Sequence, residues 1–294
     1  MKGWLIVNEF LSSEKFTELY DMLQRAAMEQ GICLEKKTNA QILPVLGEQK
    51  TPFEVDFVLF WDKDIRLAKA LENRGVFVAN SSQAIEACDD KALTHLLLEQ
   101  DKIPMPRTLL APMTYSTVGY TNLDFLEQAG EKLGFPLVVK ECFGSFGQQV
   151  YLAANQQELV QFVTALAGRP FLLQEFIESS FGKDLRLQVV GNEVVAAMYR
   201  YSENGDFRAN ISNGGKMKSY QPTEEEKQLA VKACEALGLD FAGVDILFGK
   251  NGPMVCEVNS NAHFKNIYDC TGVNTAEYIL RYLKRRVEKY SRKV

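Results

Sequence analysis

The sequence predicts a protein of mixed α/β and α+β class, and three observations support this prediction. Strands and helices alternate up to about residue 85, which is typical of a mostly parallel sheet. Later, pairs of apolar runs are joined by short turns at Gly191-Asn192 and at 249–253, as in antiparallel hairpins. At 294 residues the chain is long enough for two or three packed units.

The elements follow in order. The first unit has apolar strands at about 4–7, 32–35, 56–60 and 76–79, a helix capped by Ser13 and ending at Gly31, and a helix at 65–72. A short helix after residue 82 and a second one from Asp90-Lys91 to Gln100 precede a linker marked by Pro104 and Pro106. The second unit has helices at 123–133 and 156–167 and strands at 137–140, 150–152 and 171–177. The third has strands at 184–190 and 193–199, a polar loop at 202–220, a helix after Thr223, the hairpin 243–259 and a terminal helix from about Asn274.

Composition excludes several classes of function. A net charge of −5 argues against a broad nucleic-acid surface, which would need to be basic. Six scattered cysteines without C-x-x-C spacing suggest neither disulfides nor zinc, and two histidines offer little for a His-based triad. His95 is more consistent with packing or a surface position than with catalysis. No apolar run reaches a membrane span and none resembles a signal peptide, so we expect a cytoplasmic protein without membrane attachment.

The hairpin 243–259 carries the most informative pattern. If Phe248 faces Met254 across its turn, Asp245 lies opposite Glu257, and Asn259 shares the face of Glu257. Val244, Ile246, Cys256 and Val258 then form an apolar face that can pack into a core. Two carboxylates and an amide suit a hard cation such as Mg²⁺. The alternative is that these polar side chains are simply solvated.

A magnesium ion with open positions usually completes its shell with substrate phosphates, so a phosphate-binding loop is expected elsewhere. Lys140 ends an apolar strand and is followed by a loop that contains Gly144, Ser145 and Gly147. Backbone N–H groups of such a loop and the lysine ammonium can bind an anion. The pattern lacks the order of a P-loop, and a turn with a surface lysine is the alternative.

Polar residues near two further strand ends complete the candidate site. Gln174-Glu175-Phe176-Ile177 could bind a flat base through its main chain and apolar side chains, or be an ordinary buried strand. Asp184 and Arg186 share a strand face, and Arg200 on the paired strand should come near them. These arginines could bind an anion or form surface ion pairs. Further polar residues, Arg208 and Asn210, lie in a loop that ends at Gly214-Gly215.

The order of these motifs, from about Asn80 to Thr275, resembles the ATP-grasp ligases, and most of all the RimK-like glutamate ligases. More distant similarity extends to the amino-group carrier ligases of lysine biosynthesis and to glutathione synthetase. The segments that carry it are Lys140 with Gly144 and Gly147, then 174–177, 182–186, 205–210, 214–215, 242–245 and 257–259. The resemblance implies an ATP-grasp fold with an N-terminal pre-ATP-grasp domain (1–87), a central lid subdomain (88–178) and a C-terminal subdomain with the metal site (179–294).

The resemblance also implies the activity and the role of each residue. The family phosphorylates a carboxylate with ATP and lets an amine displace the phosphate, which gives an amide and ADP. The implied catalytic residues are Arg186 and Arg200. The implied ligands of Mg²⁺ are Asp245, Glu257 and Asn259. The resemblance implies two metal ions, and Mn²⁺ can replace Mg²⁺. The implied ATP-binding residues are Lys91, Lys140, Gly144, Ser145, Gly147, Gln174, Glu175, Phe176, Ile177, Asp184, Arg208, Ala209 and Asn210.

Two departures leave the substrates open. RimK-like enzymes usually have another glycine near Gln149, so this phosphate loop should be stiffer or differently closed. Residues 260–266 replace the usual turn after Asn259 and should border the amine, which puts glutamate in doubt as the substrate. The partner is then an amino acid, or a peptide, protein or secondary-metabolite precursor that supplies the carboxylate or the amine. A catalytically silent nucleotide-binding module is the alternative from another class, and a homo-oligomer is left open because nothing specifies an interface.

Overall fold

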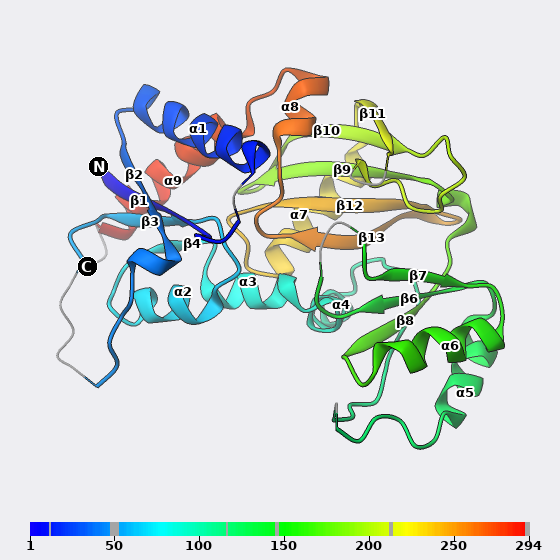
Figure 1. Ribbon diagram of the computed structural model, residues 1–294. Helices are drawn as coiled ribbons and strands as arrows, with labels where there is room; N and C mark the ends of the chain where they lie inside the picture. The colour runs from blue at the N-terminus through cyan, green and yellow to red at the C-terminus, as the bar shows by residue number, and fades with distance from the viewer. Residues whose placement is uncertain (12, 48–52, 116, 145–146, 212–213, 292–294) are drawn as a thin grey trace.

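Three β-sheets organise the part of the chain that the structure describes (Figure 1). The computed structural model describes residues 1–294 except 12, 48–52, 116, 145–146, 212–213 and 292–294. Its mixture of a parallel sheet with two antiparallel sheets confirms the predicted fold class. No helix among the described residues is both long and apolar enough to cross a bilayer.

The N-terminal sheet is parallel throughout, with strand order β2-β1-β3-β4. Its elements are β1 (Lys2–Val7), α1 (Glu14–Glu29), β2 (Cys33–Thr38), η1 (Asn39–Gln41), β3 (Phe57–Phe60), α2 (Ile65–Glu72) and β4 (Val78–Ala79). One core joins α1 to the terminal helix α9 (Thr275–Ser291), and another lies beneath α2. The beginning and the end of the chain therefore build one part of the molecule.

The second sheet is antiparallel, with order β5-β8-β6-β7. It follows the helices α3 (Ser82–Asp89) and α4 (Lys91–Gln100), and the Asp90 side chain caps α4. Its elements are β5 (Thr108–Leu110), α5 (Asp124–Leu133), β6 (Leu137–Glu141), β7 (Val150–Ala153), α6 (Gln156–Leu166) and β8 (Phe171–Glu175). Side chains of α5 and α6 pack against one face of this sheet.

The third sheet has the order β11-β10-β9-β12-β13 and is antiparallel. Its elements are η2 (Glu178–Ser180), β9 (Lys183–Val190), β10 (Glu193–Tyr201), β11 (Lys216–Ser219), α7 (Glu224–Ala236), β12 (Phe241–Gly249), β13 (Gly252–Asn259) and α8 (Lys265–Thr271). Thr223 and Glu226 form a capping box at the start of α7, which packs against the face formed by Leu185, Leu187 and Val189. Asp184 and Arg186 therefore lie on the opposite face.

Several details differ from the sequence prediction. Ser13 occupies the N-cap position of α1 but makes no side-chain capping bond, and only its carbonyl accepts bonds from the helix. The short elements β5, β11 and α8 were not predicted, because β5 and β11 are edge strands without alternating burial and α8 has only seven residues. The strand predicted at 171–177 ends at Glu175. The proposed domain boundaries fall within α3 and η2, and the division remains a prediction.

The hairpin β12–β13 has the predicted pairs Asp245–Glu257 and Gly243–Asn259 but not the predicted turn. Phe248 faces Pro253 instead of Met254, because a β-bulge leaves Cys256 without a partner on β12. Because of the bulge, the apolar face of the hairpin differs from the predicted one at Cys256. Val244, Ile246 and Val258 are buried as expected, whereas the Cys256 side chain lines the pocket described next.

Candidate functional site

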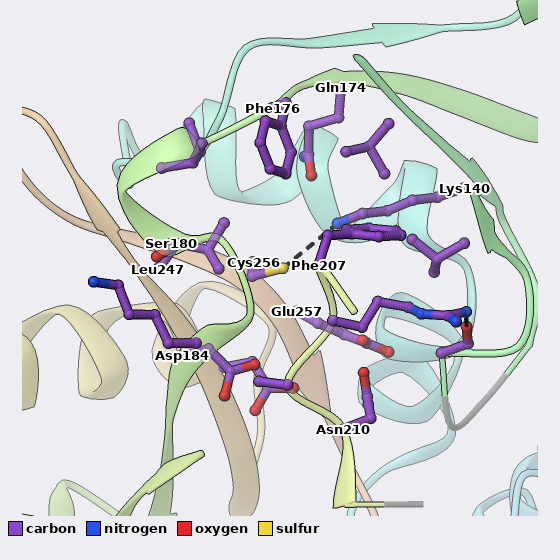
Figure 2. Close-up of a pocket in the computed structure, with 18 of the residues that line it drawn as sticks. Lys140, Gln174, Phe176, Ser180, Asp184, Phe207, Asn210, Leu247, Cys256 and Glu257 are labelled. Atoms are coloured by element: carbon purple, nitrogen blue, oxygen red, sulfur yellow. Dashed lines mark hydrogen bonds between the residues drawn. The ribbon is translucent and has the colours of Figure 1, made fainter. Parts of the chain in front are cut away.

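A pocket lies between the second and third sheets (Figure 2). It contains about 770 Å³ of empty space, including the part open to solvent. Segments far apart in the sequence supply its walls, namely the start of α4, strand β6 with Gly147 and Val150 after it, residues between Gln174 and Asp184, Arg200 of β10, the loop 207–210 and the hairpin β12–β13.

One end of the pocket is apolar. Figure 2 shows Phe176, Leu247 and Phe207 around this part of the pocket, and the Phe176 and Phe207 rings are 6.3 Å apart. The Gln174 amide, which is buried here, is held by Thr108 Oγ1 at 2.9 Å. The Glu175 side chain is bound to Arg107, and its backbone N–H donates to Arg107 O at 2.9 Å. The apolar side chains at this end suit a flat, uncharged group.

Buried cations lie in the middle of the pocket. Lys140 is only 7% exposed, and its Nζ donates to Cys256 Sγ at 3.5 Å (Figure 2). Lys91, at the start of α4, is also buried; its Nζ lies 3.2 Å from Gly144 O and 3.7 Å from Glu257 Oε1. Lysines are rarely buried unless an anion faces them. The fold therefore places two ammonium groups where an anionic ligand can bind.

The polar loop of the third unit closes one side of the pocket. Arg208 is oriented by Asp206, and its Nη1 donates to Gly147 O at 2.8 Å. A side chain at Gly147 would meet the Asn210 amide at 2.9 Å, so the two loops touch. On the other side, the Gln149 side chain fills the space beside Gly144. Ala209 is buried between the loop and the pocket.

Two arginines and two aspartates form a buried charge network. Arg200 holds Asp184 through two bonds of 2.7 and 2.6 Å, and its Nη2 lies 3.0 Å from Asp245 Oδ1. Arg186 also binds Asp245 through two hydrogen bonds. Its Nη2 donates to Oδ2 at 2.7 Å, and its Nε donates to Oδ1. Burial opposes ionisation of Asp245, but the two guanidinium groups hold its pKa below the usual range. Asp245 is therefore a carboxylate at neutral pH.

The donor set at the hairpin fits a hard cation. Asp245 and Glu257 face each other, and Asn259 lies two residues beyond Glu257 on the same face. The Asn259 Nδ2 atom is buried and has no hydrogen-bond partner among the described residues. Over the part of the chain that the structure describes, no three His, Cys, Asp or Glu side chains cluster tightly enough to hold a metal. A site here would have two carboxylates and an amide, which is the set that the sequence predicts.

The structure brings most of the predicted residues into one pocket. Those that line it are Lys91, Lys140, Gly147, Gln174, Glu175, Phe176, Ile177, Asp184, Arg200, Arg208, Ala209, Asn210, Asp245 and Glu257. Gly144, Arg186 and Asn259 lie behind this lining, in contact or in register with lining residues. Ser145 lies outside the described residues. Sequence reasoning missed Lys183, Phe207, Leu247 and Cys256, although Lys183 and Phe207 fall inside the motif segments.

Residues 88–283 match the model of the RimK-like ATP-grasp domain. The chain belongs to the RimK-like ATP-grasp family. The matched segment contains every residue that lines the pocket, so the pocket lies in the part of the chain that defines the family. The resemblance that the motifs indicate is thereby confirmed.

Relatives and one solved structure extend the comparison. The chain is 37% identical over 245 residues to "Uncharacterized protein MG012 homolog" of Mycoplasma pneumoniae, which covers 82% of this chain and 84% of the relative. It is 38% identical over 224 residues to "Probable alpha-L-glutamate ligase" of Syntrophotalea carbinolica, covering 76% and 72% of the two chains. Its fold matches the ATP-grasp ligase PsnB, solved with a phosphomimetic variant of minimal precursor, Mg and ADP, with a TM-score of 0.72, 16% identity and coverage of 97% and 98%.

Proposed function

We propose that this member of the RimK-like ATP-grasp family is an ATP-dependent carboxylate–amine ligase. It forms an amide through an acyl phosphate, releases ADP and phosphate, and uses an amino acid as one substrate. The observation that carries the proposal is the pocket itself. Figure 2 shows Lys140 between Phe176 and Glu257, and Asp245, the strand partner of Glu257, lines the same cavity. A base, a polyphosphate and a divalent cation would need these three environments in that order.

The residues at the apolar end would bind the adenine. Phe176 and Leu247 offer apolar surface, and the main chain after β8 offers N–H and C=O groups that a base edge can pair with. Asp184 lies further along the cavity, toward the ribose. Lys91, Lys140 and Arg208 would neutralise the phosphates, because each is held by the fold beside the cavity.

Asp245, Glu257 and Asn259 would hold Mg²⁺, or Mn²⁺ in its place, and the proposal includes two ions. When bound, the metal would neutralise charge on the phosphates and so assist phosphoryl transfer. Arg186 keeps Asp245 ionised and oriented, which keeps an oxygen ligand available. Arg186 and Arg200 would also stabilise the negative charge of the acyl phosphate and of the transition states on either side of it.

The substrates follow from the same chemistry. A carboxylate is a poor electrophile until one of its oxygens becomes a leaving group, so transfer of a phosphoryl group must precede attack by the amine. The names of the relatives support glutamate ligation, and the PsnB complex supports a peptide as the alternative acceptor. The segment 260–266, directly after Asn259, would border the amine.

Replacement of Glu257 tests the function. Phosphate release is measured with ATP, Mg²⁺ and pooled amino acids, alongside calorimetric binding of a non-hydrolysable ATP analogue with and without Mg²⁺. We expect amino-acid-stimulated release from the wild type and a loss on the order of 100-fold or more in Glu257→Gln and Glu257→Ala. The matched control is Glu235→Gln, on the exposed side of α7, which should behave as the wild type.

Three results would count against the proposal. Release at the wild-type rate in Glu257→Ala would refute the metal assignment. Magnesium-dependent binding without release, with every amino acid and peptide pool tried, would favour the regulatory module. No nucleotide binding would show that the fold remains and the chemistry is lost.

A further inference from the structure

Asn80 makes contacts that the proposed chemistry does not use. It follows β4 at the carboxyl edge of the N-terminal sheet and is fully buried. Its Nδ2 donates to Phe241 O at 2.9 Å and to Ser260 O at 2.8 Å. Its Oδ1 accepts from Asp240 N at 2.7 Å and from Phe241 N at 3.2 Å. The amide uses its full bonding capacity, and all four bonds lead to the third sheet rather than to its own.

The Asn80 amide binds β12 at the end where its pairing with β13 stops. The register of β12 and β13 ends with the pair Gly243–Asn259, and two further pairs on this side would set Phe241 opposite Asn261. The Asn80 amide instead binds both the N–H and the C=O of Phe241. A primary amide offers the same donor and acceptor as a peptide group. Asn80 therefore stands in for a segment of β13, and the chain leaves the sheet after Asn259.

The bond to Ser260 fixes the direction in which the chain leaves. Ser260 directly follows Asn259 and is buried. Two residues later, Ala262 packs onto Gly243 so closely that any side chain there would collide with it. The Arg186 guanidinium lies over the same glycine. The segment from Ser260 to Phe264 is thus seated beside the charge network.

A second residue of the N-terminal sheet supports the same junction. Trp61 stacks on Phe241 with ring centroids 5.5 Å apart and meets Phe264 edge to face at 5.7 Å. Trp61 follows β3, so both contacts come from the carboxyl edge of the N-terminal sheet. Asn80 differs from Trp61 in kind, since its bonds are directional and one of them reaches the residue next to Asn259.

We propose that Asn80 is a positioning residue that sets Asn259 and the 260–264 segment relative to Asp245 and Glu257. It couples the N-terminal sheet to the cation site and to the side of the pocket that the amine enters. This inference rests on the proposed function, because it takes Asn259 as a metal ligand. It assigns no contact between Asn80 and any substrate.

The test compares Asn80→Asp with the wild type. The variant keeps the size of the side chain and the acceptor for Asp240 N and Phe241 N, but it turns a carboxylate toward the carbonyls of Phe241 and Ser260. We expect Mn²⁺ affinity, followed by electron paramagnetic resonance, to fall about 10- to 100-fold, as for other groups that orient a ligand. The KM for the amine substrate should rise, and binding of the ATP analogue in EDTA should stay within twofold of the wild type.

The matched control is Tyr282→Phe. It removes a bond of 2.8 Å between Tyr282 Oη and Asp240 Oδ1, at the same end of β12, without touching Ser260. A purely structural role for Asn80 predicts that both variants lower the melting temperature and leave Mn²⁺ affinity unchanged. The variant Asn80→Ser, which introduces no charge, is measured alongside. All Mn²⁺ affinities are calculated for the fraction of protein that binds the ATP analogue in EDTA.

The outcomes separate the two proposals. If the wild type binds no Mn²⁺, the proposed function is overturned, and the positioning role of Asn80 with it. If the wild type binds Mn²⁺ and both Asn80 variants match Tyr282→Phe, the positioning role is overturned while the proposed function stands. A selective loss of Mn²⁺ affinity and a raised amine KM in the Asn80 variants would establish the role.

Discussion

The buried ammonium of Lys140 faces the thiol of Cys256 at 3.5 Å, across 116 residues of sequence. A thiol is a weak hydrogen-bond acceptor and, when protonated, carries no charge. Burial raises the pKa of Cys256, so the thiol does not neutralise the lysine at neutral pH. Lys140 is thus a buried cation whose only hydrogen-bond acceptor among the described residues is a poor one, and a phosphate oxygen would be a better partner.

This relationship gives the first prediction. Lys140→Met should weaken binding of the ATP analogue about 10- to 100-fold, because a hydrogen bond to a charged group contributes about 1.5–3 kcal/mol. The melting temperature without ligand should change little or rise, since the variant removes a buried charge. Calorimetry measures the affinity, and Lys232→Met, on the exposed side of α7, is the control. Equal affinity in the two variants would contradict a phosphate-binding role.

The thiols give a second prediction. Cys33 is exposed, whereas Cys88, Cys142 and Cys234 are buried, and burial raises the pKa of Cys88 to about 12 and of Cys142 to about 11. We expect N-ethylmaleimide to label Cys33 first and the three buried thiols only on unfolding. The ATP analogue should slow labelling of Cys256 and leave Cys33 unaffected. Peptide mass spectrometry measures the extent of labelling at each cysteine. If saturating ATP analogue does not slow the labelling of Cys256, the result would argue against nucleotide binding in this pocket.

The Cys256 side chain also shows where sequence reasoning reaches its limit. The predicted pair of Asp245 and Glu257 is correct, although it was derived from a turn in which Phe248 faces Met254. Strict alternation along the hairpin places Cys256 in the core, and it fails there because a bulge adds one residue to β13. Two errors cancel, since the wrong turn pairing and the unforeseen bulge together leave Glu257 opposite Asp245. No local signal in the sequence marks the bulge.

Other parts of the site were predictable to different degrees. Lys140 and Arg200 are recognisable because each is a charged residue on an apolar strand. Asn80 is not, since its four partners lie at least 160 residues away and no periodicity links them. Leu247 was missed for a related reason, because an apolar residue on a strand has the same pattern whether it faces a core or a ligand.

His95 shows the same limit and gives a prediction on pH. Its Nδ1 lies 2.7 Å from Lys91 O, which can only accept, so Nδ1 carries the proton and Nε2 accepts from Gln174 Nε2 at 2.9 Å. Burial, with the nearby charge of Lys140, lowers the pKa of His95 to about 4. Sequence reasoning favoured packing or a surface position over catalysis, and packing is what the structure shows.

The pKa of His95 is lower in the folded chain than in the unfolded chain, so the unfolded state takes up the proton first as the pH falls. Its contribution to stability is complete above about pH 6.5 and is lost as the pH falls toward 4. Between pH 7 and pH 5, the loss from this residue is about 2 kcal/mol. Urea unfolding of His95→Gln should show a shallower pH dependence by that amount.

His263 serves as the comparison for this prediction. Burial lowers its pKa to about 4 as well, and its Nε2 donates to Lys15 O at 3.0 Å. Since the chain has only two histidines, His263→Gln should account for the rest of the histidine-dependent slope. An unchanged slope in the double variant would mean that neither histidine is held neutral by the fold.

Arg186 and Arg200 both bind Asp245, but their surroundings predict different outcomes on substitution. Arg200 is 4% exposed and also binds Asp184, so Arg200→Met would leave the Asp184 carboxylate without its guanidinium partner, whereas Asp245 would keep Arg186. Removing one partner of a buried ion pair costs about 3–5 kcal/mol. We expect a large loss of stability, measured by urea unfolding, and partial recovery in a double variant that also carries Asp184→Leu, because no charge then stays buried at that position.

Arg186 binds Asp245 but not Asp184, so its substitution should separate catalysis from stability. Arg186→Lys keeps the positive charge beside Asp245 but cannot make the two-bond contact, and it loses the nitrogen that lies over Gly243. We expect amide formation to slow about 10²- to 10³-fold, as when one donor to a developing anion is removed. Binding of the ATP analogue should stay near the wild-type value, because the nucleotide contacts assigned to Lys140 and Phe176 are untouched. If analogue affinity and turnover fall together, Arg186 acts by shaping the nucleotide pocket and not by stabilising the acyl phosphate.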